Sequence, residues 1–255
     1  MTIKFGPAGL GPVKEAEKNL EKYHKLGFRA CEIAFTYSVY IKPADAVIIG
    51  KKAKELDIEL SIHAPYFVNL ASNEKLKVEA TKQRIIKCCE IGEMLGAKTV
   101  VFHPGYYSDD KQKAYEQIKK GIIEIMRFIK EKGWKIKIAP ETMGKINVFG
   151  SIDEISRLVE ETKCSFCIDF AHIEARDKKI DFEKVKKLFG KYKEWHCHFS
   201  GIEYSDKGER RHIKTGKDKW KEVLKNIPKN KNIVIINESP DHIKDSVEGL
   251  KMFGG

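Results

Sequence analysis

Six short apolar runs of the sequence each end at or near a residue that can bind a metal ion. The runs end in SIHAPY, VFHPG, APET, CIDFAH, HCHFSG and INES, which supply His63, His103, Glu141, Asp169 with His172, His198 and Glu238. Imidazole and carboxylate together form the ligand set of zinc, manganese and iron sites. A lone histidine at the end of a strand is more often a hydrogen-bonded structural residue. Six consecutive runs with a ligand-type side chain at the equivalent place instead indicate a shared metal site.

These runs belong to a series of eight β-rich segments that spans the chain. The segments are Ile3–Phe5, Ala30–Phe35, Glu59–Ala64, Thr99–His103, Lys135–Ala139, Ser165–Phe170, Trp195–Phe199 and Ile233–Asn237. Most are continuously apolar, as strands covered on both faces are, and each precedes a segment of helical period. We therefore expect an α/β fold, a single-domain (β/α)8 TIM barrel over residues 1–255. Its strands would bring their carboxyl ends to one mouth.

The helical pattern and the absence of a phosphate loop support the closed barrel. Between Ala114 and Glu131, isoleucines and a methionine recur every three or four residues, which predicts one buried stripe. Ser151 followed by Glu154 predicts a capping box at the start of a helix. A doubly wound sheet would usually carry a GxGxxG loop after its first strand, and the segment GPAGLG from Gly6 does not match it.

Composition and charge restrict the partners and the compartment. The formal net charge of +11 favours a polyanion such as nucleic acid, although lysines spread over amphipathic helices would give the same total. No apolar run reaches the roughly 18 residues that span a bilayer, so we expect a cytoplasmic protein without membrane contact. We also expect the protein to be a monomer. Cys164 and Cys167 form a CxxC, but no second pair lies at zinc-finger spacing, and we expect all six cysteines to be reduced.

The segment HAPYFVNLAS, from His63 to Ser72, resembles the first signature of the endonuclease IV family, including Tyr66 and Asn69. VFHPG, the ET after Pro140, CIDFAH and the late NES resemble other ligand segments of that family. These enzymes are zinc-dependent apurinic/apyrimidinic endonucleases within the xylose-isomerase-like barrels. The resemblance implies a DNA repair hydrolase that cuts the phosphodiester on the 5′ side of abasic sites.

Carried over position by position, the resemblance implies three metal subsites that hold two or three Zn²⁺ ions, with Mn²⁺ as an alternative. Glu141 would bridge the first two subsites and would be the catalytic carboxylate. The other ligands so implied are His63 and His103 in the first subsite, Asp169, His198 and Glu238 in the second, and His172 and His212 in the third. His196 shares a strand face with His198 but lies deeper, so we expect it to pack or to support a ligand.

The sequence departs from the family pattern at two places that bear on binding. Two residues before His212, where the family usually has an aspartate, the chain has Arg210. Either Glu209 replaces that ligand by a shift of one position, or the third subsite is weak or empty and Arg210 contacts a phosphate instead. The loop FTYSVYIK carries Tyr37 and Tyr40 where the family inserts polar and basic side chains into DNA. We expect Tyr37, Tyr66, Asn69 and Arg210 to bind substrate.

Two other functions remain open. Glu141, Asp169, His198 and Glu238 also resemble the single-metal set of ketose 3-epimerases, in which two glutamates exchange the proton, so a sugar isomerase or epimerase is the alternative. A one-metal epimerase does not require His63, His103 and His212, and we therefore favour the nuclease. A catalytically silent nucleic-acid-binding barrel would leave buried carboxylates without a purpose, and burying an unpaired charge is costly.

Overall fold

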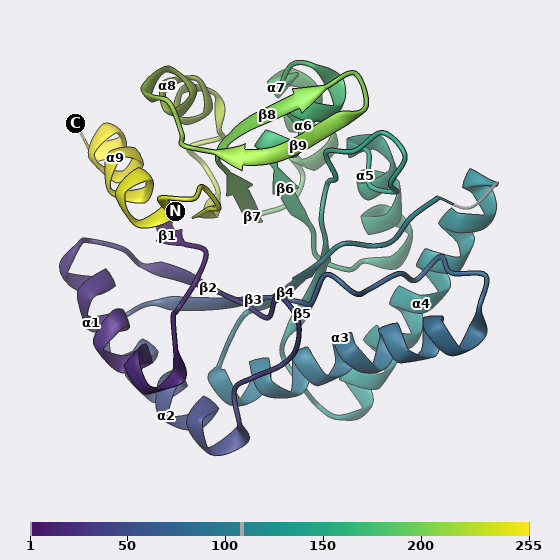
Figure 1. Cartoon of the computed structure of the whole chain (residues 1–255), viewed down its shortest axis with the longest axis horizontal. Helices are drawn as coiled ribbons and strands as arrows, with labels where there is room; N and C mark the ends of the chain where they lie inside the picture. Colours follow the sequence, from purple (N-terminus) through teal and green to yellow (C-terminus); the bar gives the residue numbers. More distant parts are fainter. Residues whose placement is uncertain (1, 108–109, 255) are drawn as a thin grey trace.

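Eight parallel strands form the central barrel of the computed structural model, which describes residues 2–107 and 110–254. Residues 1, 108–109 and 255 of the expected single domain lie outside this description. Figure 1 shows the strands at the centre with helices around them. The barrel strands are β1 (Ile3–Pro7), β2 (Ala30–Ala34), β3 (Glu59–His63), β4 (Thr99–Phe102), β5 (Lys137–Pro140), β6 (Cys167–Asp169), β7 (Glu194–Phe199) and β10 (Asn232–Asn237).

The barrel consists of two parallel half-sheets that meet at two seams. One half-sheet has the order β2-β3-β4-β5 and the other the order β1-β10-β7-β6. A single bridge between Ala8 and Glu32 joins them at one seam, and a bridge between Glu141 and Cys167 joins them at the other. Each seam therefore carries a glutamate that the barrel buries completely. The predicted (β/α)8 barrel is confirmed.

Helices follow the strands and bury the apolar stripes that the sequence predicts. Ile118, Ile122 and Ile129 are buried as expected, while Met126 is only partly buried. The capping box forms, with Glu154 N donating to Ser151 Oγ and Ser151 N donating to Glu154. The helices are η1 (Val13–Glu15), α1 (Ala16–Lys25), α2 (Pro43–Glu55), α3 (Lys75–Leu95), α4 (Lys111–Glu131), α5 (Ile152–Thr162), α6 (Phe170–Asp177), α7 (Phe182–Phe189), α8 (Lys217–Asn226) and α9 (His242–Gly254).

Five predicted strands are shorter than expected, three of them (β2, β3 and β4) by their last residue alone. The segment predicted from Lys135 begins only at Lys137. The segment predicted to run through Phe170 ends at Asp169, because Asp169 caps α6 by accepting a hydrogen bond from His172 N at 2.8 Å. His172 therefore lies in the first turn of a helix.

A hairpin that the strand pattern does not predict lies between β7 and α8. Its strands are β8 (Gly201–Ser205) and β9 (Gly208–Ile213), and it packs against α6 (Figure 1). Gly208 has a φ of +93° and lies so close to Gly144 O that a Cβ atom would come within 2.2 Å. Glu209 N also donates to Gly144 O at 3.1 Å. These contacts fix the start of β9 against the loop after β5.

None of the helices in residues 2–107 and 110–254 is long and apolar enough to cross a membrane. The six cysteines are buried and free of disulfides, as expected.

Candidate metal centre

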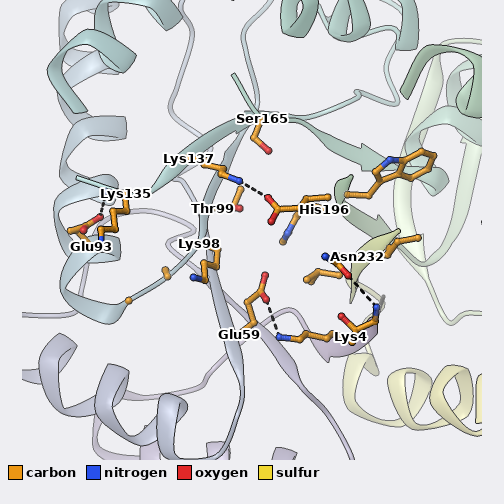
Figure 2. A pocket seen from close by; sticks show the side chains of 17 residues that line it. Lys4, Glu59, Glu93, Lys98, Thr99, Lys135, Lys137, Ser165, His196 and Asn232 are labelled. Atoms are coloured by element: carbon orange, nitrogen blue, oxygen red, sulfur yellow. Dashed lines mark hydrogen bonds and ion pairs between the residues drawn. The ribbon is translucent and has the colours of Figure 1, made fainter. Parts of the chain in front are cut away.

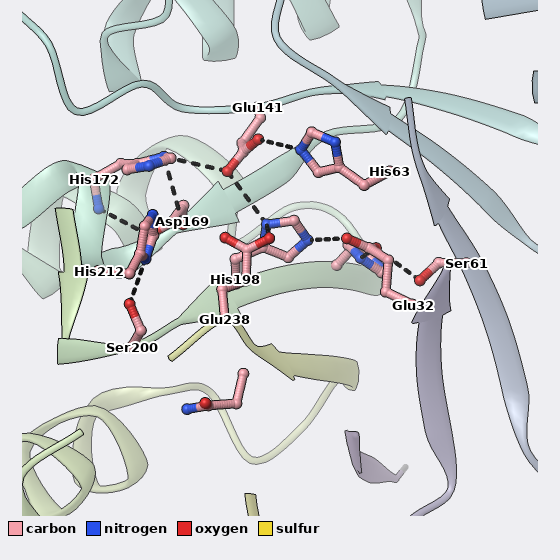
Figure 3. Close-up of polar contacts among 12 residues, drawn as sticks. Glu32, Ser61, His63, Glu141, Asp169, His172, His198, Ser200, His212 and Glu238 are labelled. Carbon is pink, nitrogen blue, oxygen red and sulfur yellow. Dashed lines mark hydrogen bonds and ion pairs between the residues drawn. The ribbon is translucent and has the colours of Figure 1, made fainter. Parts of the chain in front are cut away.

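The structure gathers the eight predicted metal ligands at the carboxyl end of the barrel, and Figure 3 labels all of them except His103. A cavity of about 320 Å³ opens there and is lined in part by His63, His103, His172, His212 and Glu238. The ligand atoms form three overlapping groups, and within each group all of them lie within 4.8 Å of one another. The groups are His63, His103 and Glu141; Glu141, Asp169, His198 and Glu238; and Asp169, His172 and His212.

Glu141 lies at the centre of these groups and is fully buried. Its Oε2 is 3.2 Å from Nε2 of His63 and 3.2 Å from Nε2 of His103. Its Oε1 is 3.2 Å from Nδ1 of His198 and 3.2 Å from Nδ1 of His172. Burial alone would raise the pKa of Glu141, but the charge of His198 and the hydrogen-bonding histidines hold it well below its usual range. Each oxygen of this carboxylate thus faces a different pair of histidines, the arrangement of a bridging ligand.

The spacing of these atoms fits a metal polyhedron. Ligands at 2.0–2.1 Å from a tetrahedral zinc ion lie about 3.3–3.4 Å from one another, and Glu141 lies 3.2 Å from the facing nitrogens of His63, His103 and His198. Nδ1 of His172 instead donates to Thr142 O at 2.9 Å, which leaves its Nε2 for an ion. The buried Oδ2 of Asp169 has no hydrogen-bond partner within the part of the chain described. This oxygen lies 3.4 Å from His172 Nδ1 without forming a hydrogen bond, and a buried carboxylate is costly unless a cation compensates it. The residues present therefore fit divalent cations.

The protonation of the histidines opposes metal binding in part. Burial lowers the pKa of His63, but Glu141 outweighs this effect and raises that pKa to about 9. Burial lowers the pKa of His103. An ion that binds His63 must displace its proton, so occupancy is linked to pH.

The second group completes the centre on the opposite side of Glu141. His198 Nδ1 lies 3.4 Å from Glu238 Oε1, and the parallel register pairs Asp169 with His198 across β6 and β7. Burial raises the pKa of Glu238, but the neighbouring His198 lowers it to about 2. Glu238 is thus a carboxylate at neutral pH, as a metal ligand must be.

The hairpin brings Glu209, and not Arg210, to the third group. A register shift pairs Tyr204 with Glu209 and Glu203 with Arg211, which leaves Arg210 as the extra residue of a bulge. Glu209 Oε2 lies 3.4 Å from His172 Nε2, and Glu209 Oε1 lies 3.9 Å from His212 Nε2. The side chain of Arg210 is 64% exposed, and its Nη1 lies 3.6 Å from Glu203. The bulge moves the acidic side chain by one position, as the replacement hypothesis requires.

The predicted substrate-binding side chains differ in their exposure to solvent and in the hydrogen bonds that they already form within the chain. The Tyr66 ring lies 5.9 Å from the His63 ring and 5.5 Å from the His103 ring, and half of Tyr66 is exposed. Tyr37 is 77% exposed, and its ring lies 6.3 Å from that of Phe67. Asn69 instead uses its Oδ1 to accept from Ala71 N at 3.0 Å and from the Tyr106 N–H at 3.2 Å. Asn69 therefore holds the loop beside the mouth, and its contact with substrate stays a prediction.

Sequence analysis missed one residue of this region, Glu32. It is fully buried on β2, and its Oε1 lies 2.9 Å from Nε2 of His198. The signal that could have identified it is the acidic residue inside the apolar run ACEIAF, because an unpaired charge is rarely buried in a strand.

A larger cavity lies at the other end of the barrel and has a different chemistry (Figure 2). It measures about 440 Å³ and is lined by the amino ends of strands. Lys4 Nζ lies 3.0 Å from Glu59, and Lys137 forms an ion pair with Glu194. These carboxylates are compensated by lysines, whose protonated ammonium groups have no lone pair for a metal.

Comparison with known proteins identifies a family but does not decide between an endonuclease and an epimerase. A family model described as xylose isomerase-like TIM barrel matches residues 20–253. An uncharacterized protein of Methanocaldococcus jannaschii is 38% identical, over 98% of this chain and 96% of its own length. A probable endonuclease 4 of Mesomycoplasma hyopneumoniae strain J is 32% identical, over 45% of this chain and 42% of its own length.

Two solved structures resemble the whole barrel almost equally. Endonuclease IV from Thermus thermophilus has a TM-score of 0.74 at 19% identity, covering 98% of this chain and 97% of its own. A D-psicose 3-epimerase crystallised in the presence of D-fructose has a TM-score of 0.73 at 18% identity, covering 99% of this chain and 100% of its own. The fold alone therefore does not separate a nuclease from an epimerase.

Proposed function

The chain belongs to the xylose isomerase-like TIM barrel family, and we propose that within this family it is a zinc-dependent endonuclease that cuts DNA on the 5′ side of abasic sites. The observation that carries this proposal is the double use of Glu141. Both of its oxygens face histidine pairs at 3.2 Å, which suits a carboxylate shared between ions. An epimerase with one metal needs no such bridge.

The candidate ligands divide into sets that would bind two or three ions. His63 and His103 would hold one ion with Glu141, and His198, Asp169 and Glu238 would hold a second. His172 and His212 would hold a third, with Glu209 as the replacement ligand. When bound, such ions supply positive charge for a phosphate and acidify a water molecule. Because one chain supplies every ligand, we propose that the monomer is active.

The side chains at the rim suit a nucleic acid. Tyr37, Phe67, Tyr66 and Tyr106 are all more than half exposed, and aromatic rings at a mouth can stack on unpaired bases. Burial, with Glu238 and Glu141 nearby, raises the pKa of Tyr66 to about 12. Tyr66 therefore keeps its proton at neutral pH and can donate it in a hydrogen bond to a phosphate oxygen. The net charge of +11 agrees with a polyanionic partner.

The test uses a duplex oligonucleotide with one abasic-site analogue. The protein, stripped with a chelator and reloaded with Zn²⁺ or Mn²⁺, is expected to cut 5′ to the lesion and to leave an undamaged duplex intact. The stripped protein is the matched control. Zinc-loaded protein that binds two or three ions and still fails to cut would exclude the nuclease.

A ketose 3-epimerase is the second candidate, favoured by the group of Glu141, Asp169, His198 and Glu238. This group alone provides one complete four-ligand site with two glutamates that could exchange a proton across a sugar carbon. One tightly bound ion per chain, with D-psicose converted to D-fructose and no incision of the abasic duplex, would favour this function. Metal analysis of protein purified without added metal is therefore the first measurement to make.

A further inference from the structure

A second polar layer lies beneath the ligand groups, deeper in the barrel, and its centre is Glu32 (Figure 3). Glu32 Oε2 accepts a hydrogen bond from Ser61 Oγ at 2.7 Å and lies 2.8 Å from His196 Nε2. All three residues are buried. His196 also lines the cavity at the amino end of the barrel (Figure 2), so this layer lies between the two cavities.

His198 connects this layer with the candidate metal centre through its two ring nitrogens. Nδ1 faces Glu141 at 3.2 Å and Glu238 at 3.4 Å, whereas Nε2 lies 2.9 Å from Glu32 Oε1. A neutral imidazole has one N–H and one lone pair. In this structure Nδ1 forms a hydrogen bond with the Glu141 carboxylate. An ion bound by His198 would need the lone pair of Nδ1, and the hydrogen of the neutral ring would then be on Nε2, which faces Glu32.

The carboxylate of the lower layer has shorter contacts than the carboxylate of the upper layer. The contacts of Glu32 measure 2.7 to 2.9 Å, which is the range of hydrogen bonds. The contacts of Glu141 with His63 and His198 are longer hydrogen bonds of 3.2 Å, a separation that is also close to the spacing of ligands around a zinc ion. Cys167, His196 and His198 could also surround an ion, but Glu32 already occupies hydrogen-bonding distance from both histidines. The lower layer is therefore a support and not another metal site.

Burial makes this support necessary. Glu32 Oε1 and His198 Nε2 are both buried and form no well-aligned hydrogen bond within the part of the chain described, so their 2.9 Å approach is the contact that compensates both. Removing the carboxylate would leave Nε2–H facing an apolar barrel and the Cys167 thiol, which is only a weak partner. The imidazole could then take the other tautomer, with its hydrogen on Nδ1, where it cannot bind metal.

We propose that Glu32 is a positioning residue of the metal centre, which holds His198 by its Nε2–H so that Nδ1 is presented to the ion that Glu141, Asp169 and Glu238 would bind. Ser61 and His196 orient the carboxylate through its other oxygen. This inference rests on the proposed metal site, but it does not depend on whether the substrate is DNA or a sugar. Carboxylate partners of ligating histidines typically change metal affinity by roughly 10- to 100-fold.

The experiment compares the metal affinities of Glu32→Gln and wild type by chelator competition with Zn²⁺, in the absence of any substrate. We expect one ion to bind roughly 10- to 100-fold more weakly in Glu32→Gln and the remaining ions to be unaffected. In ¹H–¹⁵N spectra of the zinc-loaded wild type, His198 should carry its hydrogen on Nε2, and this resonance should shift or disappear in the variant. Cys167→Ala, which removes the other group beneath His198, and Glu59→Gln, at the far end of the barrel, are the matched controls and should retain every affinity.

Ser61→Ala keeps the test decisive if Glu32→Gln does not fold. It removes one hydrogen bond to the carboxylate and should weaken the same ion about threefold, the effect of a single hydrogen bond. Unchanged zinc affinity in Glu32→Gln, an equal loss at every subsite, or a wild-type His198 that carries its hydrogen on Nδ1 would overturn the proposal. So would a wild-type protein that binds no ion through His198. Weaker binding of that ion in a protein that cuts no DNA would uphold the proposal and reject the nuclease.

Discussion

The two ends of the barrel carry carboxylates with opposite kinds of partner. At the amino end, Glu59 and Glu194 face Lys4 and Lys137. At the carboxyl end, the ion-pair partners of the Glu141 carboxylate within residues 2–107 and 110–254 are histidines. A lysine neutralises a carboxylate by its own charge, whereas a neutral histidine offers a lone pair and leaves the negative charge for a cation. Glutamates thus form ion pairs with lysines at one end, and at the other end a glutamate lies at the centre of the candidate metal site.

The largest effect should come from Glu141→Gln. Loss of a shared anionic ligand removes several kcal/mol of charge stabilisation, on the order of a thousandfold in rate or more. We expect incision of the abasic duplex to fall by at least that factor while circular dichroism stays that of the wild type. Glu194→Gln is the control at the amino end and should cut normally. Wild-type incision by Glu141→Gln would remove the bridging role of Glu141.

The hairpin also gives two neighbouring residues different partners: Glu209 lies beside two histidines, and Arg210 lies beside Glu203. Glu209→Gln should lose one ion and roughly 10- to 100-fold of the incision rate, because Glu209 lies beside His172. Arg210→Ala should retain the metal content, since its side chain faces solvent and Glu203. Metal analysis of both variants checks this difference. Equal metal content in the two would mean that the bulge does not select a ligand.

The aromatic rim predicts a moderate effect on binding. Tyr37→Ala should weaken binding to the abasic duplex about tenfold, the scale of one lost stacking contact, while Tyr37→Phe should bind as the wild type does. Fluorescence anisotropy with a labelled duplex measures both. Weaker binding of Tyr37→Phe than of the wild type would assign the contribution to the phenol hydroxyl instead of the ring.

Binding should also weaken steadily as salt rises, because lysines and arginines that contact phosphates release counterions. The slope of log affinity against log salt measures the number of such contacts. An affinity that does not change with salt would contradict a DNA partner. The conversion of D-psicose to D-fructose would then be the relevant assay.

The smallest effect is expected at the amino end of the barrel. Lys4→Met breaks the ion pair with Glu59, whose two side chains are 25% and 28% exposed. Partly exposed pairs contribute about 1 kcal/mol or less, so urea unfolding should show a loss of that size. Metal content and incision should not change. A loss of bound metal in this variant would show that the two ends are coupled.

The sequence by itself determined the barrel and the positions of the candidate ligands. Continuous apolar strands can be buried only between layers, and parallel strands deliver their carboxyl ends to one mouth. His63, His103 and Glu141 could therefore be placed together from their positions at strand ends, and the structure brings them within reach of one another.

Tertiary structure decided what depends on contacts between distant segments. The choice between Glu209 and Arg210 follows from a bulge that forms only because β9 pairs with β8 and packs on Gly144. Glu32 meets His198 across 166 residues of sequence, because β2 and β7 face each other inside a closed barrel. Periodicity shows that a side chain is buried, but which partner satisfies its charge is settled only when the two half-sheets close.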